Sequence, residues 1–476
     1  MPISLPSSLM VSVSGFRGRV GDPLTPELVA GLAAAFGAFL QSEGLGNTVC
    51  VGRDSRTSGP MFLRAVVAGL QSVGTWVVDL GVVPTPTLLM ATEHHGSAGG
   101  IAITASHNPA EWNALKLVTG EGIFLDAELS SRFQVYLRSE DPPRADWDGL
   151  GEVVEDPSAW SRHLTAILGL PELDLPGLRA RSFHVAIDCV HGAGGLAMPE
   201  LLKQLGCRVS AIGTDPDGRF PRDPEPTSAN LEALSRLVRE SGADVGLAVD
   251  PDVDRLSLVD EGGQPLGEDL TLALAAAVVL SRTPGPVVTN LSTSRVVEDV
   301  ATAFGCRVVR AAVGEVNVAR RMQAEGAVIG GEGNGGVIHP RLQHTRDALA
   351  ATALILQHLL DEGKAVSAAA SRWPSYVIVK EKVSFPRGAL PDAYHALIEG
   401  FSPVETNTSD GLRLAWPEAR AWLHVRPSGT EPVVRLIAEA PEVAEARDLV
   451  RVVAERLQVI ARGYQRDGRG EMRDVR

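Results

Sequence analysis

The chain has 476 residues, enough for about three or four domains. It is 44% hydrophobic and 21% charged, so each domain can bury a core, and an aromatic content of 5% leaves small aliphatic side chains to fill it. The formal net charge of −14 excludes general binding of nucleic acid or of anionic membranes, and an anionic substrate would need locally gathered basic residues.

Cysteine spacing and hydropathy exclude further classes. None of the cysteines forms a CxxC pair, which predicts neither a zinc site nor a disulfide framework and favours a reducing, cytoplasmic location. No basic residue precedes Arg17, so we expect no signal peptide. The longest uncharged apolar run, near residues 271–280, is too short to cross a bilayer. The cysteines are Cys50, Cys189, Cys207 and Cys306.

Strand-like apolar segments recur in three sets of three, with helix-like stretches between them. They begin at residues 48, 75 and 99, at 183, 206 and 243, and at 286, 305 and 326. Strands that alternate with helices predict βαβ units and parallel sheets. The second strands of the second and third sets share the tetrapeptide GCRV, which favours a triplicated unit.

The pattern changes near residue 370. Four strand-like segments follow, at 375–385, 410–416, 421–429 and 432–440, with helix-like segments at 390–401 and 442–458. Successive strands with no helix between them predict an antiparallel sheet. The predicted fold is therefore α/β, with three repeated mixed or parallel-sheet domains and a C-terminal α+β domain. The predicted domains are residues 1–150, 151–257, 258–370 and 371–476.

The third strand of each set ends in an unusual loop, at the sheet edge where α/β proteins bind ligands. The first loop is Thr104-Ala105-Ser106-His107-Asn108-Pro109. Ser106 is either a nucleophile activated by His107, a phosphate carrier, or part of an ordinary capped turn. The spacing does not fit GxSxG, which disfavours an acyl-transfer serine.

The second loop is Asp250-Pro251-Asp252-Val253-Asp254-Arg255. In an extended segment the three aspartates point the same way, and their charges repel unless a cation lies between them. Oxygen ligands of this kind suit Mg²⁺ or Ca²⁺, although a solvated acidic turn remains an alternative. Arg255 in place of the EF-hand glycine and the flanking strands disfavour an EF-hand.

Two further loops have ligand-binding patterns. Residues 331–336, GEGNGG, allow close approach of the backbone to a ligand, and Glu332 can accept hydrogen bonds from sugar hydroxyls; a flexible loop is the alternative. Residues 426–432, RPSGTEP, combine an arginine, hydroxyls and consecutive backbone N–H groups. That combination fits either a phosphate cradle or a plain turn.

In this order the four loops resemble those of the α-D-phosphohexomutase superfamily, which includes phosphoglucomutase, phosphomannomutase and phosphoglucosamine mutase. The resemblance extends to SGFRG at 14–18, VGRDSRTSG at 51–59, DLGVVPTPT at 79–87, DCVHGAGG at 188–195 and RD at 346–347. It implies four domains around a central cleft. It also implies reversible phosphoryl transfer between O6 and O1 of a hexose, through a hexose 1,6-bisphosphate.

The resemblance also implies residue roles. Ser106 would be the phosphoserine and, with Asp250, Asp252 and Asp254, would hold one Mg²⁺. Catalytic-centre residues would be Arg17, His107, Lys116 and Arg255. Substrate would be bound by Glu332, Asn334, Arg426, Ser428, Gly429 and Thr430. We expect a phosphosugar as the partner, no nucleic acid or membrane, and a cytoplasmic monomer or homodimer.

The chain departs from the family pattern at three loops. Many relatives read GExSGH where this chain has Asn334 and Gly336, so a histidine proposed to assist proton transfer is missing and the acid/base assignment stays open. The metal loop lacks the glycines of DGDGDR, and Ala114 replaces a glycine. The GEGNGG form is most similar to a phosphoglucosamine mutase subgroup, so we expect glucosamine phosphate as substrate. The alternatives are a phosphoglucomutase/phosphomannomutase, a Mg²⁺-dependent phosphosugar phosphatase, or a non-catalytic binding protein.

Overall fold

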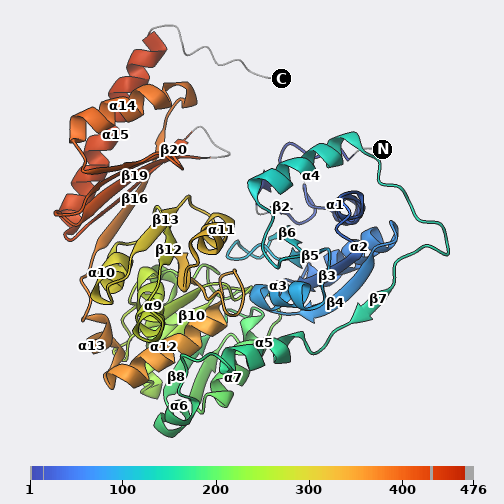
Figure 1. Ribbon diagram of the computed structural model, residues 1–476, viewed down its shortest axis with the longest axis horizontal. Coiled ribbons are helices and arrows are strands. Elements are labelled where there is room, and N and C mark those ends of the chain that lie inside the picture. The colour runs from blue at the N-terminus through green and yellow to red at the C-terminus, as the bar shows by residue number, and fades with distance from the viewer. Residues whose placement is uncertain (1–2, 14, 429–432, 467–476) are drawn as a thin grey trace.

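A computed structural model describes residues 3–13, 15–428 and 433–466. Within these residues the strands form four sheets that follow one another along the chain, and helices separate and cover them (Figure 1). The three α/β units and the antiparallel C-terminal unit confirm the predicted fold class.

The first unit is built on a mixed sheet with the described order β1-β2-β6-β5-β3-β4-β7. Strands β5, β3, β4 and β7 are parallel, whereas β6 runs antiparallel to both β5 and β2. The elements are β1 (Met10–Ser12), β2 (Gly15–Arg19), α1 (Pro26–Ser42), β3 (Thr48–Arg53), α2 (Gly59–Gln71), β4 (Trp76–Val82), α3 (Thr85–His94), β5 (Gly99–Ile103), β6 (Trp112–Thr119), α4 (Ala127–Ser139) and β7 (Val153–Glu155).

The second and third units repeat one arrangement. Their described orders are β11-β10-β8-β9 and β13-β12-β14-β15, each with three parallel strands and an antiparallel fourth beside the third. The second unit contains α5 (Ala159–Leu168), α6 (Leu175–Arg181), β8 (His184–Asp188), α7 (Gly194–Gln204), β9 (Arg208–Ile212), α8 (Glu232–Ser241), β10 (Val245–Val249) and β11 (Leu256–Val259). The third contains α9 (Asp269–Arg282), β12 (Val287–Asn290), α10 (Val296–Ala303), β13 (Val308–Ala311), α11 (Glu315–Glu325), β14 (Ile329–Glu332), β15 (Gly336–Ile338), α12 (Ala348–Glu362) and α13 (Val366–Ala370).

The C-terminal unit has an antiparallel sheet with the described order β16-β20-β19-β18-β17. Helices α14 and α15 cover its outer face (Figure 1). The elements are β16 (Val377–Ser384), α14 (Leu390–Phe401), β17 (Glu405–Asn407), β18 (Leu412–Trp416), β19 (Ala421–Pro427), β20 (Val433–Ala440) and α15 (Val443–Arg466).

All nine strands predicted for the repeats are present, as are the four strands and two helices predicted near the C-terminus. Of the antiparallel fourth strands, only β11 was predicted, as a strand that flanks the acidic loop. Strand β15 has three residues, too few to show a clear periodicity. Beyond residue 150, β7 pairs with β4 and so extends the first sheet.

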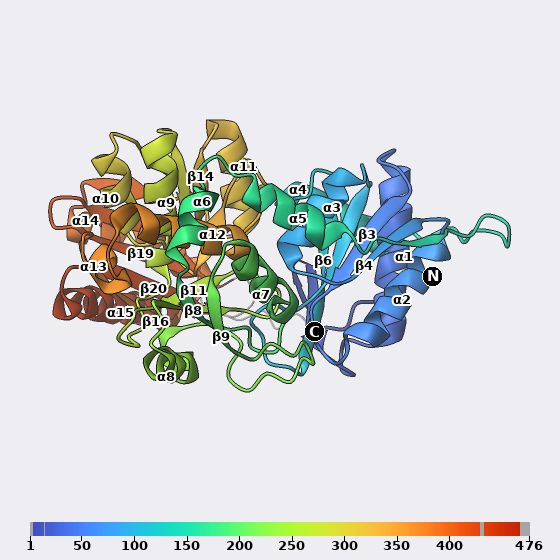
Figure 2. The same cartoon turned by 90° about the horizontal axis from the view of Figure 1, so that it is seen from below.

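The second and third units share one hydrophobic core. Helix α12 packs against α5, α6 and α7 of the second unit as well as against α9 of the third. The first and C-terminal units each have a core of their own. Figure 2 shows the first unit as a separate body at one side, where α5 lies against α3.

The apolar run at 271–280 lies inside α9 and is entirely buried in the shared core. In the part of the chain that the structure describes, no helix combines the length and apolarity needed to span a bilayer. The four cysteines are free thiols.

The C-terminal unit meets the third unit through polar contacts. Ser292 Oγ lies 2.8 Å from His424 Nδ1, and Arg413 Nε donates to the Leu291 carbonyl at 3.1 Å. Glu439 Oε1 accepts from the backbone N–H of Arg295 at 2.9 Å and from Trp422 Nε1 at 2.7 Å. Hydrogen bonds of this kind join the two units.

Glu439 makes the stability of this boundary depend on pH. Burial raises the pKa of its carboxyl. The folded protein therefore keeps a proton that the unfolded chain releases near pH 4.3, so stability is greatest at low pH and falls as pH rises through the folded pKa. Glu439→Gln keeps an acceptor but removes the charge. We expect its first unfolding transition to exceed that of the wild type by a few degrees at pH 8, and by less at pH 5. Calorimetry at both pH values measures the difference, and an equal difference at both would contradict it.

Candidate functional site

Ser106 follows the end of β5 in a left-handed backbone conformation, with φ 50°. Its Oγ donates to Asp250 Oδ2 at 2.9 Å and lies 3.3 Å from His107 Nδ1. A non-glycine residue in this region stores strain and is frequent at functional sites. The turn thus brings the serine hydroxyl from the first unit onto the acidic loop of the second.

Arg56 holds this turn in place, a role that no sequence motif predicted. The guanidinium is fully buried; its Nη2 donates to the carbonyls of Ser106 and Asn108, each at 2.6 Å, and its Nη1 donates to that of Pro109 at 2.6 Å. Its Nε donates to Asp54 Oδ2 at 3.0 Å. Five donors in a rigid fork can satisfy several carbonyls at once, which fixes the loop. The only sequence signal was the segment VGRDSRTSG.

The three aspartates of the second loop converge between β10 and β11. Asp250, Asp252 and Asp254 are buried, and one carboxylate oxygen of each lies within 4.8 Å of the others. The expected extended geometry was wrong: the loop is a turn in which Val253 has φ 63°. A β-branched residue in this region is rare, so surrounding contacts must hold it. One of them is the hydrogen bond from Ala348 N to the Val253 carbonyl, at 3.2 Å.

The charges of this acidic cluster fit a divalent cation. Burial, together with Asp254 and Asp252, raises the pKa of Asp250 well above its usual range. Burial also disfavours ionisation of Asp252, but Lys116, whose Nζ lies 2.8 Å from Oδ2, outweighs it and lowers the pKa of that carboxyl. Among the described residues, none donates a hydrogen bond to Asp252 Oδ1 or Asp254 Oδ1. Buried oxygens without donors, at carboxylates that repel one another, are suited to Mg²⁺.

Basic side chains surround Ser106. Lys116 extends from β6, and Arg17 from β2 donates through Nη1 to Asn108 Oδ1 at 2.5 Å. Arg255 donates through Nη1 to Glu225 Oε1 at 2.9 Å. Burial, then Arg255 and Arg17, lower the pKa of His107, so its ring is neutral in this state.

The third loop places Glu332 at the end of β14. Glu332 Oε1 accepts from Asn290 Nδ2 at 2.8 Å and from Gly314 N at 3.0 Å, and Oε2 accepts from Arg346 Nη1 at 2.8 Å. Asn334 Oδ1 accepts from Gly336 N at 3.2 Å. Neither Asn290 nor Arg346 was predicted as a site residue.

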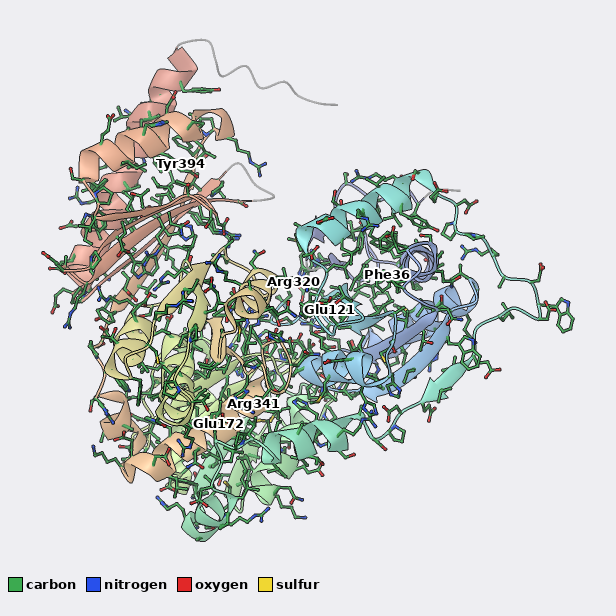
Figure 3. All side chains as sticks on the ribbon, in the orientation of Figure 1. Phe36, Glu121, Glu172, Arg320, Arg341 and Tyr394 are labelled. Carbon is green, nitrogen blue, oxygen red and sulfur yellow. The ribbon has the colours of Figure 1, made fainter. Side chains whose placement is uncertain are left out.

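His339 does not replace the missing histidine. It is buried, and its Nε2 lies 3.6 Å from Glu172 Oε2. Figure 3 labels Glu172 close to Arg341, whose Nε lies 4.0 Å from Glu172 Oε1. His339 is absent from the residues that line the cavity described below.

The fourth loop follows β19 in the C-terminal unit. Arg426 Nε donates to Asp410 Oδ2 at 2.8 Å, and the same oxygen accepts from Val313 N of the third unit at 3.0 Å. Ser428 is buried, and its carbonyl accepts from Arg387 Nη2 at 2.5 Å. Gly429 and Thr430 lie outside the described residues. Asp410, which the sequence did not single out, therefore connects the predicted clamp arginine to the third unit.

One cavity of about 670 Å³ collects the predicted residues. Ser428 and the three aspartates are not among its lining residues. Predicted site residues from all four units line it: Arg17, Ser106, His107, Lys116, Arg255, Glu332, Asn334 and Arg426. Further residues that line it are Glu315, Arg346 and Asp410.

An ion pair and a hydrogen bond between side chains also join the first and third units. Arg320 on α11 contacts Glu121, which follows β6, at 2.5 Å, and Figure 3 shows the two labelled side by side at the junction of these units. Gln343 Nε2 donates to Glu93 Oε2 on α3 at 2.9 Å. These contacts keep the sugar loop and the serine loop on opposite walls of one cavity.

The fold and this site define a phosphohexomutase. Four family domains match the chain in order: phosphoglucomutase/phosphomannomutase α/β/α domain I over residues 9–141, domain II over 161–263, domain III over 267–376, and the C-terminal domain over 381–456. The chain belongs to the phosphoglucomutase/phosphomannomutase family and is an isomerase.

Relatives match nearly the full length of the chain. A probable phosphoglucosamine mutase from Methanopyrus kandleri is 38% identical over 92% of this chain and 95% of its own. A phosphoglucomutase/phosphomannomutase from Thermococcus kodakarensis is 37% identical over 94% and 98%. The crystal structure of a phosphoglucomutase/phosphomannomutase family protein from Burkholderia thailandensis superposes with a TM-score of 0.83 at 28% identity, over 95% of this chain and 98% of that one.

Proposed function

We propose that this enzyme interconverts glucosamine 6-phosphate and glucosamine 1-phosphate through a phosphoserine at Ser106 and a hexose 1,6-bisphosphate. The observation that carries the proposal is the position of Ser106 Oγ, 2.9 Å from Asp250 and on the wall of a cavity lined by five basic side chains from all four units. These side chains are Arg17, Lys116, Arg255, Arg346 and Arg426.

Phosphoryl transfer needs alignment and neutralisation of charge rather than elaborate covalent chemistry. The phosphoserine P–Oγ bond breaks as a bond forms from phosphorus to O1 or O6 of the sugar, and a proton passes from the sugar hydroxyl to Ser106 Oγ. His107 Nδ1 is placed to hold that proton, because a phosphate dianion on Ser106 raises the pKa of the adjacent ring. Mg²⁺ on the three aspartates would supply a Lewis acid that draws charge from the transferring group.

The same chemistry then runs in reverse from the other end of the sugar. The bisphosphate turns over in the cavity and returns its second phosphate to Ser106. Arg426 lines the cavity from the C-terminal unit, whereas Ser106 lines it from the first unit. Arg426 binds the phosphate that is not reacting. Glu332 accepts hydrogen bonds from the sugar hydroxyls.

The choice of glucosamine is supported by charge. Glu315, Glu332 and Asp410 line the side of the cavity formed by the third and C-terminal units, and an ammonium group at C2 of the sugar is attracted to carboxylates. The printed name of the Methanopyrus kandleri relative agrees with this choice, whereas that of the Thermococcus kodakarensis relative favours glucose or mannose phosphates.

A coupled assay with glucosamine, glucose and mannose 6-phosphates tests the proposal. We expect the largest kcat/KM with glucosamine 6-phosphate and stimulation by hexose 1,6-bisphosphate. Faster turnover of glucose or mannose phosphate would overturn the substrate. Release of inorganic phosphate without isomerisation would instead identify a phosphatase.

Arg426→Ala should weaken binding of the non-reacting phosphate. Loss of a charge-assisted, bidentate contact costs about 1.5–3 kcal/mol, or roughly 10- to 100-fold in affinity. The loss should appear with both the 1-phosphate and the 6-phosphate, because one clamp serves both orientations. Added hexose 1,6-bisphosphate should partly restore the rate by rephosphorylating enzyme that has lost its intermediate.

The matched control for charge is Arg451→Ala on the exposed face of α15, which removes one positive charge from the same unit. Initial rates in both directions, with and without bisphosphate, distinguish the two variants. An effect of Arg426→Ala in one direction only would show that this arginine is not a shared clamp.

A further inference from the structure

Arg346 lies between β15 and α12, where its guanidinium contacts both the acidic loop and the sugar loop. Its Nη2 donates to Asp254 Oδ2 at 2.5 Å, and its Nη1 donates to Glu332 Oε2 at 2.8 Å. Glu315 Oε2 lies 3.3 Å from Nη2. Arg346 is 8% exposed, Glu332 is 4% exposed and Asp254 is not exposed at all. Three carboxylates, two of them on buried residues, therefore share one cation.

Gly336 provides the space that this side chain occupies. A Cβ at position 336 would lie 2.2 Å from Cδ and 2.9 Å from Cγ of Arg346, closer than carbon atoms approach. Gly336 has no left-handed φ, so its backbone does not require glycine. The observed position of the Arg346 side chain therefore requires glycine at position 336. Any side chain there must displace the guanidinium.

The guanidinium ties together two loops from different units. Beside it, the backbone bond from Leu256 N to the Gly335 carbonyl, at 3.0 Å, also joins them. Arg346 takes one oxygen of each carboxylate and so fixes how each is rotated. On Asp254 this leaves Oδ1 with no hydrogen bond from the described residues. On Glu332 it leaves Oε1 to accept hydrogen bonds from Asn290 Nδ2 and Gly314 N.

We propose that Arg346 is a positioning residue that couples the metal site to the sugar site, by holding Asp254 and Glu332 in a single arrangement. The proposal rests on the proposed function for the identity of the two sites. A planar fork can contact both carboxylates, whereas the ammonium of a lysine is a point charge. Loss of the fork therefore weakens Mg²⁺ binding and sugar binding together, even where the positive charge is kept.

Arg346→Lys is the first test. Mg²⁺ binding is measured by calorimetry without sugar, and binding of glucosamine 6-phosphate is measured separately on the metal-free protein. We expect each dissociation constant to rise roughly 10-fold or more, the usual cost of losing a partner that orients a ligand. KM should rise with them while kcat changes less. Arg413→Lys is the control: it alters another buried arginine, in the C-terminal unit, and should leave Mg²⁺ affinity unchanged.

Gly336→Ala provides a second test that changes no charge. Its methyl group should displace Arg346 and weaken both affinities in the same direction. In an Arg346→Ala background the two closest contacts of this methyl group are gone and only Asn334 Oδ1, at 3.1 Å, stays near it. The methyl group should then add little, so the two substitutions should be non-additive.

The proposal is overturned if Arg346→Lys alters only thermal stability, if it changes only one of the two affinities, or if the two substitutions are additive. Because the binding measurements need no turnover, they test the role of Arg346 independently of the proposed function. Failure of every hexose phosphate in the coupled assay would reject that function without deciding the role of Arg346.

Discussion

Ser106→Ala should abolish mutase activity, with kcat lower by on the order of 10⁴- to 10⁶-fold, the cost of removing a covalent nucleophile. The reason is local: the hydroxyl that lies 2.9 Å from Asp250 is the only group we assign as phosphoryl carrier. Intact mass and peptide mapping of the active wild type should find one phosphoryl group, on Ser106. That group adds about −1.5 to −2 charge beside the acidic loop.

Ser97→Ala is the matched control for this substitution. Ser97 is also a buried serine of the first unit, and its Oγ lies 3.3 Å from Cys50 Sγ rather than on the cavity wall. Its loss should leave both phosphorylation and turnover near wild-type values. Substantial activity in Ser106→Ala, or a phosphoryl group found on another residue, would reject the phosphoserine mechanism.

Asp252→Asn should weaken Mg²⁺ binding by at least about 10- to 100-fold, since even an outer partner of a metal ligand costs that much when lost. Hard cations prefer anionic oxygens, and the substitution also removes the partner of Lys116. Titration of Mg²⁺ by calorimetry, together with the Mg²⁺ dependence of the rate, measures the effect. A chelator should abolish the activity of the wild type, and added Mg²⁺ should restore that activity.

Asp260→Asn is the control for this charge change. Asp260 is buried at the end of β11, and its Oδ1 accepts from the backbone of Gly262 and Gln264, outside the acidic cluster. Its Mg²⁺ dependence should match that of the wild type. If Asp252→Asn behaved as this control does, the metal would have to bind elsewhere.

Much of the architecture could be predicted because the signals are local. Strands such as β10 are continuously apolar and buried, and glycine-, proline- or aspartate-rich loops follow their ends. The edge rule for parallel sheets then places Ser106 and Asp250 each at the ligand-binding edge of its own sheet. That these two edges face each other was implied only by the family resemblance.

The remaining features depend on contacts between distant parts of the chain. No local pattern could show that Arg56 would gather the carbonyls around Ser106, or that Gly336 leaves room for Arg346. The acidic loop converges through the left-handed turn at Val253, although propensity gives a β-branched residue an extended conformation. Tertiary contacts override that preference.

The shared core of the second and third units limits how the enzyme can change shape. Within the described chain the two middle units are not cored independently, because α12 packs into both and one hydrophobic cluster spans them. Interdigitated side chains resist sliding, so the two middle units should turn as one rigid block. Acidic loop and sugar loop then keep a constant spacing through a catalytic cycle. Under the proposed mechanism, room for the bisphosphate to turn over would then come from hinge motion of the outer bodies, which carry Ser106 and Arg426.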